Sequence, residues 1–96
     1  MDELYQRLDL AVMQVNTIKN KVARQDLIKM IRTVDSAMTA ADQELVECRR
    51  LHRETIPYRE AVQQTRSLID NLEKHITFAA LIGWHYKILY YNKDYG

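Results

Sequence analysis

Two stretches of the chain decide its fold: LIKMIRTVDSAMTAADQELVEC at residues 27–48 and YREAVQQTRSLIDNLEKHITFA at residues 58–79. In each stretch, apolar or small side chains recur in alternating steps of four and three residues. This spacing is typical of the buried seam of a heptad-patterned α-helix. The seam positions are Leu27, Ile31, Val34, Met38, Ala41, Leu45 and Cys48 in the first stretch and Tyr58, Val62, Thr65, Ile69, Leu72, Ile76 and Ala79 in the second. We therefore expect an all-α protein.

The two seams have equal length, which predicts that they pair with each other. Folding the chain back near residues 53–57 aligns them in antiparallel order, so that Cys48 meets Tyr58 and Leu27 meets Ala79. Pro57 suits the first turn of a helix, where its missing N–H costs nothing, and Thr55 is a suitable cap before it. The sequence thus predicts an antiparallel helical hairpin over residues 27–82.

A third seam precedes the hairpin, in a predicted helical arm over residues 1–23. The step from Val22 to Leu27 is five residues long, so on a straight helix the first two seams would face different directions. Either the helix breaks at residues 23–26, with Asp26 capping the next helix in a three-helix bundle, or one helix runs from Asp2 to Glu54. Residues 21–25 contain neither Gly nor Pro, which slightly favours the continuous helix.

The continuous helix would leave the seam of the arm without a partner in the hairpin. An apolar stripe of this length on a monomer is typical of an interaction surface. We therefore expect the protein to form a homo-oligomer, most simply a dimer that completes a four-helix bundle. The predicted oligomerisation residues are Leu4, Leu8, Ala11, Val15, Ile18 and Val22.

The segment at residues 83–96 differs from the rest of the chain because it is rich in Trp and Tyr. These side chains combine large contact areas with polar tips and are enriched in interface hot spots. The predicted partner-binding residues are Trp84, Tyr86, Tyr90 and Tyr91. The rings could instead pack against residues 4–22 or lie at a membrane surface. The segment could be extended, but a helix to about residue 90 is favoured.

The charges of the chain are balanced, with 14 Lys and Arg, 13 Asp and Glu and a net charge of +1. This balance argues against a strongly basic nucleic-acid-binding protein. Two local basic clusters leave nucleic-acid binding as the alternative function, because several cations on one face can contact a phosphate backbone. The candidate polyanion contacts are Lys19, Lys21, Arg24, Arg32, Arg49, Arg50 and Arg53.

Catalytic and metal-binding patterns are weak in this sequence. The single cysteine, Cys48, lies on a predicted buried seam, and the three histidines are not spaced as zinc ligands on a helix. The carboxylates do not converge on a predicted pocket. We therefore expect no enzyme activity, no metal and no cofactor.

The class of protein follows from these features. We expect a single helical domain that is cytoplasmic, because Asp2 and Glu3 oppose the basic start of a signal peptide and no apolar run is long enough to span a membrane. The predicted function is that of a protein–protein interaction module, such as an adaptor, inhibitor or assembly factor. It would associate with itself and bind a protein partner through helix faces and the aromatic segment.

Overall fold

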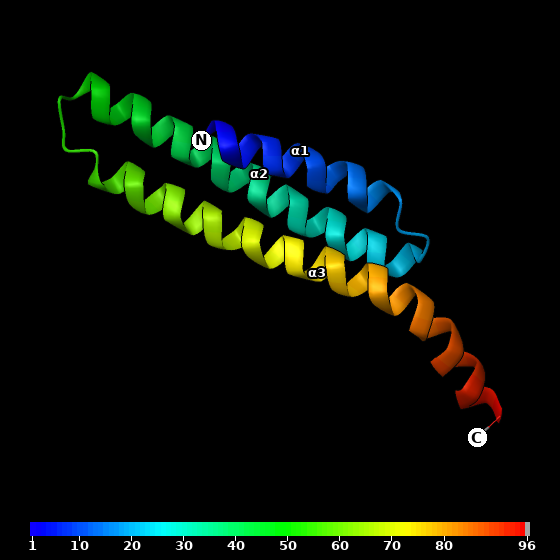
Figure 1. Cartoon of the computed structure of the whole chain (residues 1–96). Helices are drawn as coiled ribbons and strands as arrows, with labels where there is room; N and C mark the ends of the chain where they lie inside the picture. Colours follow the sequence, from blue (N-terminus) through cyan, green and yellow to red (C-terminus); the bar gives the residue numbers. More distant parts are fainter. Residues whose placement is uncertain (96) are drawn as a thin grey trace.

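The computed structural model describes the backbone of residues 1–95 and the side chains of residues 1–81. It contains three α-helices, α1 (Asp2–Asn16), α2 (Lys21–Arg50) and α3 (Ile56–Tyr95), and residues 1–95 form no strand. The prediction of an all-α protein is confirmed. The three helices contact one another in a bundle, with α1 and α3 running in one direction and α2 in the other (Figure 1). As far as the structure describes them, none of these helices has the length and apolar character needed to cross a membrane.

The connection between α1 and α2 corrects the prediction of one helix from Asp2 to Glu54. The chain bends at residues 17–20, earlier than the alternative break at residues 23–26, and Asp26 lies inside α2. Asn20 has extended backbone angles (φ −69°, ψ 116°), and its side chain accepts a 3.0 Å hydrogen bond from the amide of Ala23. This contact satisfies one of the free N–H groups at the start of α2 and favours a new helix there.

The connection between α2 and α3 occupies residues 51–55, slightly earlier than the predicted turn near residues 53–57. His52 has a positive φ of 52°, which a non-glycine residue adopts mainly where the chain turns sharply. Pro57 lies in the first turn of α3, where its missing N–H has no intrahelical acceptor to lose. This short connection places α2 and α3 side by side in opposite directions (Figure 1).

The core lies where the three helices meet, and every helix contributes to it. α2 and α3 bury residues from both of the stretches that predicted the fold, namely Leu27, Val34, Met38, Ala41, Cys48, Thr65, Ile69, Leu72 and Ile76. The remaining seam positions on these two helices are half-buried. α1 lies against α2 and α3 and adds Leu4, Leu8, Ala11 and Val15, and Ile18 follows from the connection.

This packing corrects the prediction that the first seam lacks cover within its own chain. Five of the six predicted oligomerisation residues, from Leu4 to Ile18, are buried by α2 and α3 of the same chain. The sixth, Val22, is 72% exposed on the first turn of α2 and takes no part in the core. The reason is the bend at residues 17–20, because it turns α1 back along the other two helices.

Polar groups in the core have their hydrogen bonds satisfied. Thr65 is fully buried, and its hydroxyl donates a 2.8 Å hydrogen bond to the backbone carbonyl of Ala61, one turn earlier on α3. Over residues 1–81, no buried side-chain nitrogen or oxygen lacks a partner. An unsatisfied buried polar group would cost about 1–3 kcal/mol, so the core has no local weakness of this kind.

Candidate functional site

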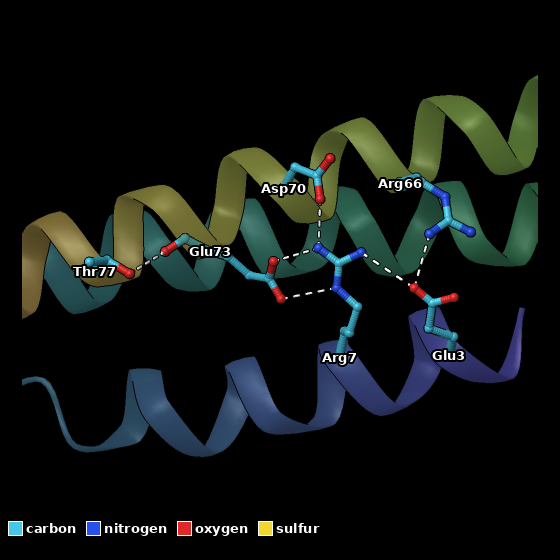
Figure 2. A network of polar contacts seen from close by, with 6 residues as sticks. All are labelled: Glu3, Arg7, Arg66, Asp70, Glu73 and Thr77. Atoms are coloured by element: carbon cyan, nitrogen blue, oxygen red, sulfur yellow. Dashed lines mark hydrogen bonds and ion pairs between the residues drawn. The ribbon is translucent and has the colours of Figure 1, made fainter.

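The most developed polar cluster on the described surface joins α1 to α3. Arg7 of α1 directs its guanidinium to Asp70 and Glu73 on α3 (Figure 2). Its Nη2 lies 2.6 Å from Asp70 Oδ1 and 2.5 Å from Glu73 Oε1, and its Nε lies 3.1 Å from Glu73 Oε2. Two parallel hydrogen bonds to one carboxylate form the geometry in which arginine binds most strongly and most specifically.

Glu3 extends this cluster along α1. Its Oε1 lies 3.0 Å from Arg66 Nη1 on α3 and 3.9 Å from Arg7 Nη1 on its own helix (Figure 2). We call Glu3, Arg7, Arg66, Asp70 and Glu73 the α1–α3 ion network. The hydrogen bonds that Arg7 donates to Glu73 and then to Asp70 raise its pKa above its usual range. Glu3 on α1 faces Arg66 on α3, and Arg7 on α1 faces Asp70 and Glu73 on α3. Opposite charges therefore meet only at one position of α1 along α3.

A separate contact holds α1 to α2. The phenol of Tyr5 donates a hydrogen bond to Asp42 Oδ2, across 37 residues of sequence. This hydrogen bond, followed by burial and by the negative charge of Asp42, raises the pKa of Tyr5 to about 12. A tyrosinate would lose the donated proton and would face the carboxylate of Asp42, so the contact persists only while Tyr5 is protonated.

The raised pKa of Tyr5 predicts how stability changes in alkali. Between the usual tyrosine pKa of about 10 and the folded value of about 12, the folded chain holds a proton that the unfolded chain has released. The contribution of Tyr5 is therefore complete below pH 10 and is lost as the pH rises through about 12. We expect Tyr5→Phe to flatten this part of a denaturation profile against pH. Asp42→Asn, which removes the carboxylate and keeps Tyr5, should flatten the profile as well, and an unchanged profile in both variants would contradict the assignment.

An open groove follows α3 from the ion network towards the C-terminal end of the helix. It has a volume of about 490 Å³ and is lined by Asp70, Glu73, Lys74, Thr77, Phe78 and Leu81. At its acidic end, Asp70 and Glu73 bind the guanidinium of Arg7, whereas Phe78 and Leu81 are each 62% exposed at the other end. An exposed Phe and Leu one turn apart on a helix can contact an apolar side chain of another molecule.

The predicted partner-binding residues Trp84, Tyr86, Tyr90 and Tyr91 lie on the continuation of α3. The backbone is helical there and continues to Tyr95, past the predicted end near residue 90 and in place of the extended alternative. The placement of these four side chains lies outside the residues whose side chains the structure describes. We call residues 82–95 the α3 extension.

The predicted polyanion contacts fall into two groups at opposite ends of the bundle. Lys19, Lys21, Arg24 and Arg32 lie near the start of α2, whereas Arg49, Arg50 and Arg53 lie at its end. Their nearest members in sequence, Arg32 and Arg49, are 17 residues apart, or roughly 25 Å along α2. Within them, Arg24 donates a 3.2 Å hydrogen bond to the carbonyl of Ile18, and Arg50 pairs with Glu47 at 2.8 Å. The fold does not combine the two groups into one basic face.

The residues considered for metal binding or catalysis remain scattered. Residues 1–81 contain no group of three or more His, Cys, Asp or Glu side chains arranged around a possible metal ion. Cys48 is 2% exposed at the end of the core, as its seam position predicted. The Nδ1 atom of His75 lies 2.8 Å from the backbone carbonyl of Asn71, one turn earlier on α3.

The sequence reasoning missed the contacts that attach α1. Arg7, Asp70 and Glu73 carry no motif, and their separation of more than 60 residues gives no local signal. The only hint was the pair Glu3 and Arg7, which are four residues apart and can pair on one helix. Recognising the rest required knowledge that α1 folds back parallel to α3.

Comparison with protein-family models, curated proteins and solved structures found no match to this chain. The basis for a functional proposal is therefore the geometry of α3: the open groove at residues 70–81 and the α3 extension that follows it. Both features lie on one helix, and the groove leads directly into the extension along the chain.

Proposed function

We propose that the protein is a helical interaction module that binds a partner protein through the open groove and the α3 extension. In this proposal, α2 and α3 form a heptad-patterned hairpin, α1 stabilises it, and no catalysis is involved. The residues assigned to partner binding are Trp84, Tyr86, Tyr90 and Tyr91. We further propose a cytosolic setting, in which the buried thiol of Cys48 stays reduced.

The observation that carries this proposal is the length of α3. This helix has 40 residues and its antiparallel neighbour α2 has 30, a difference that corresponds to about 15 Å of helix. Figure 1 accordingly shows α3 continuing past the connection between α1 and α2. The extension has the sequence IGWHYKILYYNKDY, in which eight of the fourteen residues are aromatic or branched aliphatic. A segment of this composition beyond the bundle supports a role in contact with another protein.

The chemistry of the groove is consistent with the same role. Phe78 and Leu81 are exposed on the turns that lead to the extension, so apolar surface begins inside the described part of α3. An amphipathic helix of a partner could lie along α3, with apolar side chains at three- and four-residue spacing against these positions. Trp84 and Tyr90 would then supply the large contact areas that dominate binding energies.

The test compares the proteins that three immobilised forms of the full chain capture. We expect wild type and the control Met13→Ala, which changes an exposed residue of α1, to retain the same partner. The double variant Trp84→Ala, Tyr90→Ala should retain at least tenfold less, because hot-spot truncations cost about 2 kcal/mol or more. Circular dichroism checks that each form is folded. Equal retention by all three forms would contradict the proposal.

A spectroscopic measurement with the captured partner adds an independent test. Trp84 is the only tryptophan of the chain, so its emission reports on the α3 extension alone. A purified partner without tryptophan near its contact surface should shift this emission to shorter wavelength as the ring leaves water. Unchanged emission at saturating partner would place the contact elsewhere.

A further inference from the structure

The connection between α1 and α2 is a bend of only four residues, 17–20, between two α-helices. Thr17 keeps helical backbone angles (φ −87°, ψ −10°), and Asn20 departs from them mainly in ψ, which is 116°. Residues 17–20 contain no Gly or Pro, and neither do the flanking helices up to Arg50. Helical backbone angles throughout residues 17–20 would therefore join α1 and α2 into one helix.

The contacts that hold α1 in place do not depend on this connection. Leu4, Leu8, Ala11 and Val15 pack against α2 and α3, Tyr5 binds Asp42, and the α1–α3 ion network adds the charged contacts. Each of these contacts joins α1 to the pair formed by α2 and α3. An identical α1 from another copy of the chain would find the same apolar surface and the same complementary charges.

We propose that two copies of this chain form a dimer by exchanging α1. In each copy the connection straightens, α1 continues in line with α2, and it binds the α2–α3 pair of the other copy. Within one chain, α1 runs antiparallel to α2 and its end lies beside the start of α2 (Figure 1). A two-fold axis through the straightened connections of the two copies reproduces this arrangement between them. The α1 of each copy then runs antiparallel to the α2 of the other copy and begins beside its middle.

The free-energy difference between the two forms is small for a physical reason. Exchange breaks the contacts of α1 within each chain and forms the same contacts between chains, so these largely cancel. The bend contributes the Asn20 cap, the hydrogen bond from Arg24 to the carbonyl of Ile18 and the burial of Ile18. The straight form gains helical hydrogen bonds through residues 17–20. Protein concentration and the conformation of residues 17–20 therefore set the balance. This inference does not depend on the α3 extension.

Lys21→Pro tests the role of the connection. Lys21 is the first residue of α2, where proline is favoured, and Asn20 already has the extended conformation that precedes a proline. The bent form therefore accepts this substitution. In a continuous helix, the proline would lose a hydrogen bond and clash with the preceding turn, a penalty equivalent to roughly a 100-fold change in equilibrium at each connection. Lys21→Ala removes the same charge without blocking the helix and is the matched control.

The mass in solution provides the first readout. After refolding at millimolar concentration, we expect wild type and Lys21→Ala to contain a dimer of twice the 11.4 kDa chain mass by light scattering. Lys21→Pro should remain monomeric under the same conditions. A wild type that is monomeric throughout, or a Lys21→Pro variant that dimerises as wild type does, would overturn the proposal.

Mixing two charge variants distinguishes exchange of α1 from any other dimer. Arg7→Glu reverses the charge that α1 contributes to the ion network and leaves α3 unchanged. Glu73→Arg reverses a charge on α3 and leaves α1 unchanged. When α1 is exchanged between the two variants, one site of the mixed dimer pairs the two substituted side chains, whose charges are again opposite. The other site pairs the original Arg7 with the original Glu73. Only the mixed dimer restores both pairs, so we expect a 1:1 heterodimer to form at a lower concentration than the dimer of either variant alone. Two variants that stay separate on mixing, while wild type dimerises, would show that its dimer forms without exchange.

Discussion

Replacing Leu72 with alanine is expected to lower the free energy of unfolding by about 2–5 kcal/mol. The side chain is 0% exposed at the centre of the core, where residues of all three helices surround it. Truncation removes buried methyl groups and leaves a cavity that the rigid helices cannot fill completely. The measurement is urea unfolding followed by circular dichroism, with the midpoint and slope compared between variant and wild type.

Leu81→Ala is the matched control for this prediction. It makes the same chemical change on the same helix, but Leu81 is 62% exposed. We expect the free energy of unfolding to change by no more than about 0.5 kcal/mol, as is usual for surface substitutions. Equal losses for Leu72→Ala and Leu81→Ala would mean that the core does not lie where these helices meet.

Reversing the charge of Arg7 is the second substitution with a large expected effect. Arg7→Glu removes the hydrogen bonds to Asp70 and Glu73 and places a new carboxylate among three others, including that of Glu3. We expect a loss of about 1–3 kcal/mol of stability, the scale of hydrogen bonds to charged groups reduced by partial exposure. Unfolding experiments should show that the loss shrinks in 1 M salt, because charges are then screened within about 3 Å.

Two further variants control for the effect of charge alone. Arg50→Glu also reverses an arginine, but Arg50 is exposed and, among the residues whose side chains the structure describes, pairs only with Glu47 on its own helix, so its effect should be much smaller. Adding Glu73→Arg to Arg7→Glu in the same chain should recover part of the lost stability, because the pair is then restored with opposite orientation. A double variant as unstable as the sum of the two single variants would show that these side chains do not interact.

The helices themselves could be predicted because their signal is local. Alternating steps of three and four apolar residues, together with very few glycines and prolines, favour a helix wherever they occur. Pro57 likewise marked the start of α3 to within a residue, since its geometry restricts where it can lie. These inferences need no knowledge of what packs against each helix.

The path of the chain between α1 and α2 could not be predicted in the same way. The bend replaces helical hydrogen bonds with the Asn20 cap and the burial of Ile18, and the balance depends on the surface that receives α1. Helix propensity favoured continuity slightly, but differences in propensity amount to tenths of a kcal/mol per residue. Burial of Leu4, Leu8 and Val15 on α1 outweighs them, because each of these side chains contributes about 1.5–3 kcal/mol.

Some features of the candidate site could likewise be predicted from the sequence, and others could not. The aromatic composition of residues 83–96 was visible in the sequence, whereas the α1–α3 ion network and the contact between Tyr5 and Asp42 were not. The sequence by itself determined that the chain is helical and which face of each helix is apolar, because both depend on the spacing of neighbouring residues. Only the tertiary structure decided that α1 folds back, which surface it covers and which charges it meets. Those outcomes depend on contacts between residues distant in sequence, and such contacts leave no periodic pattern along the chain.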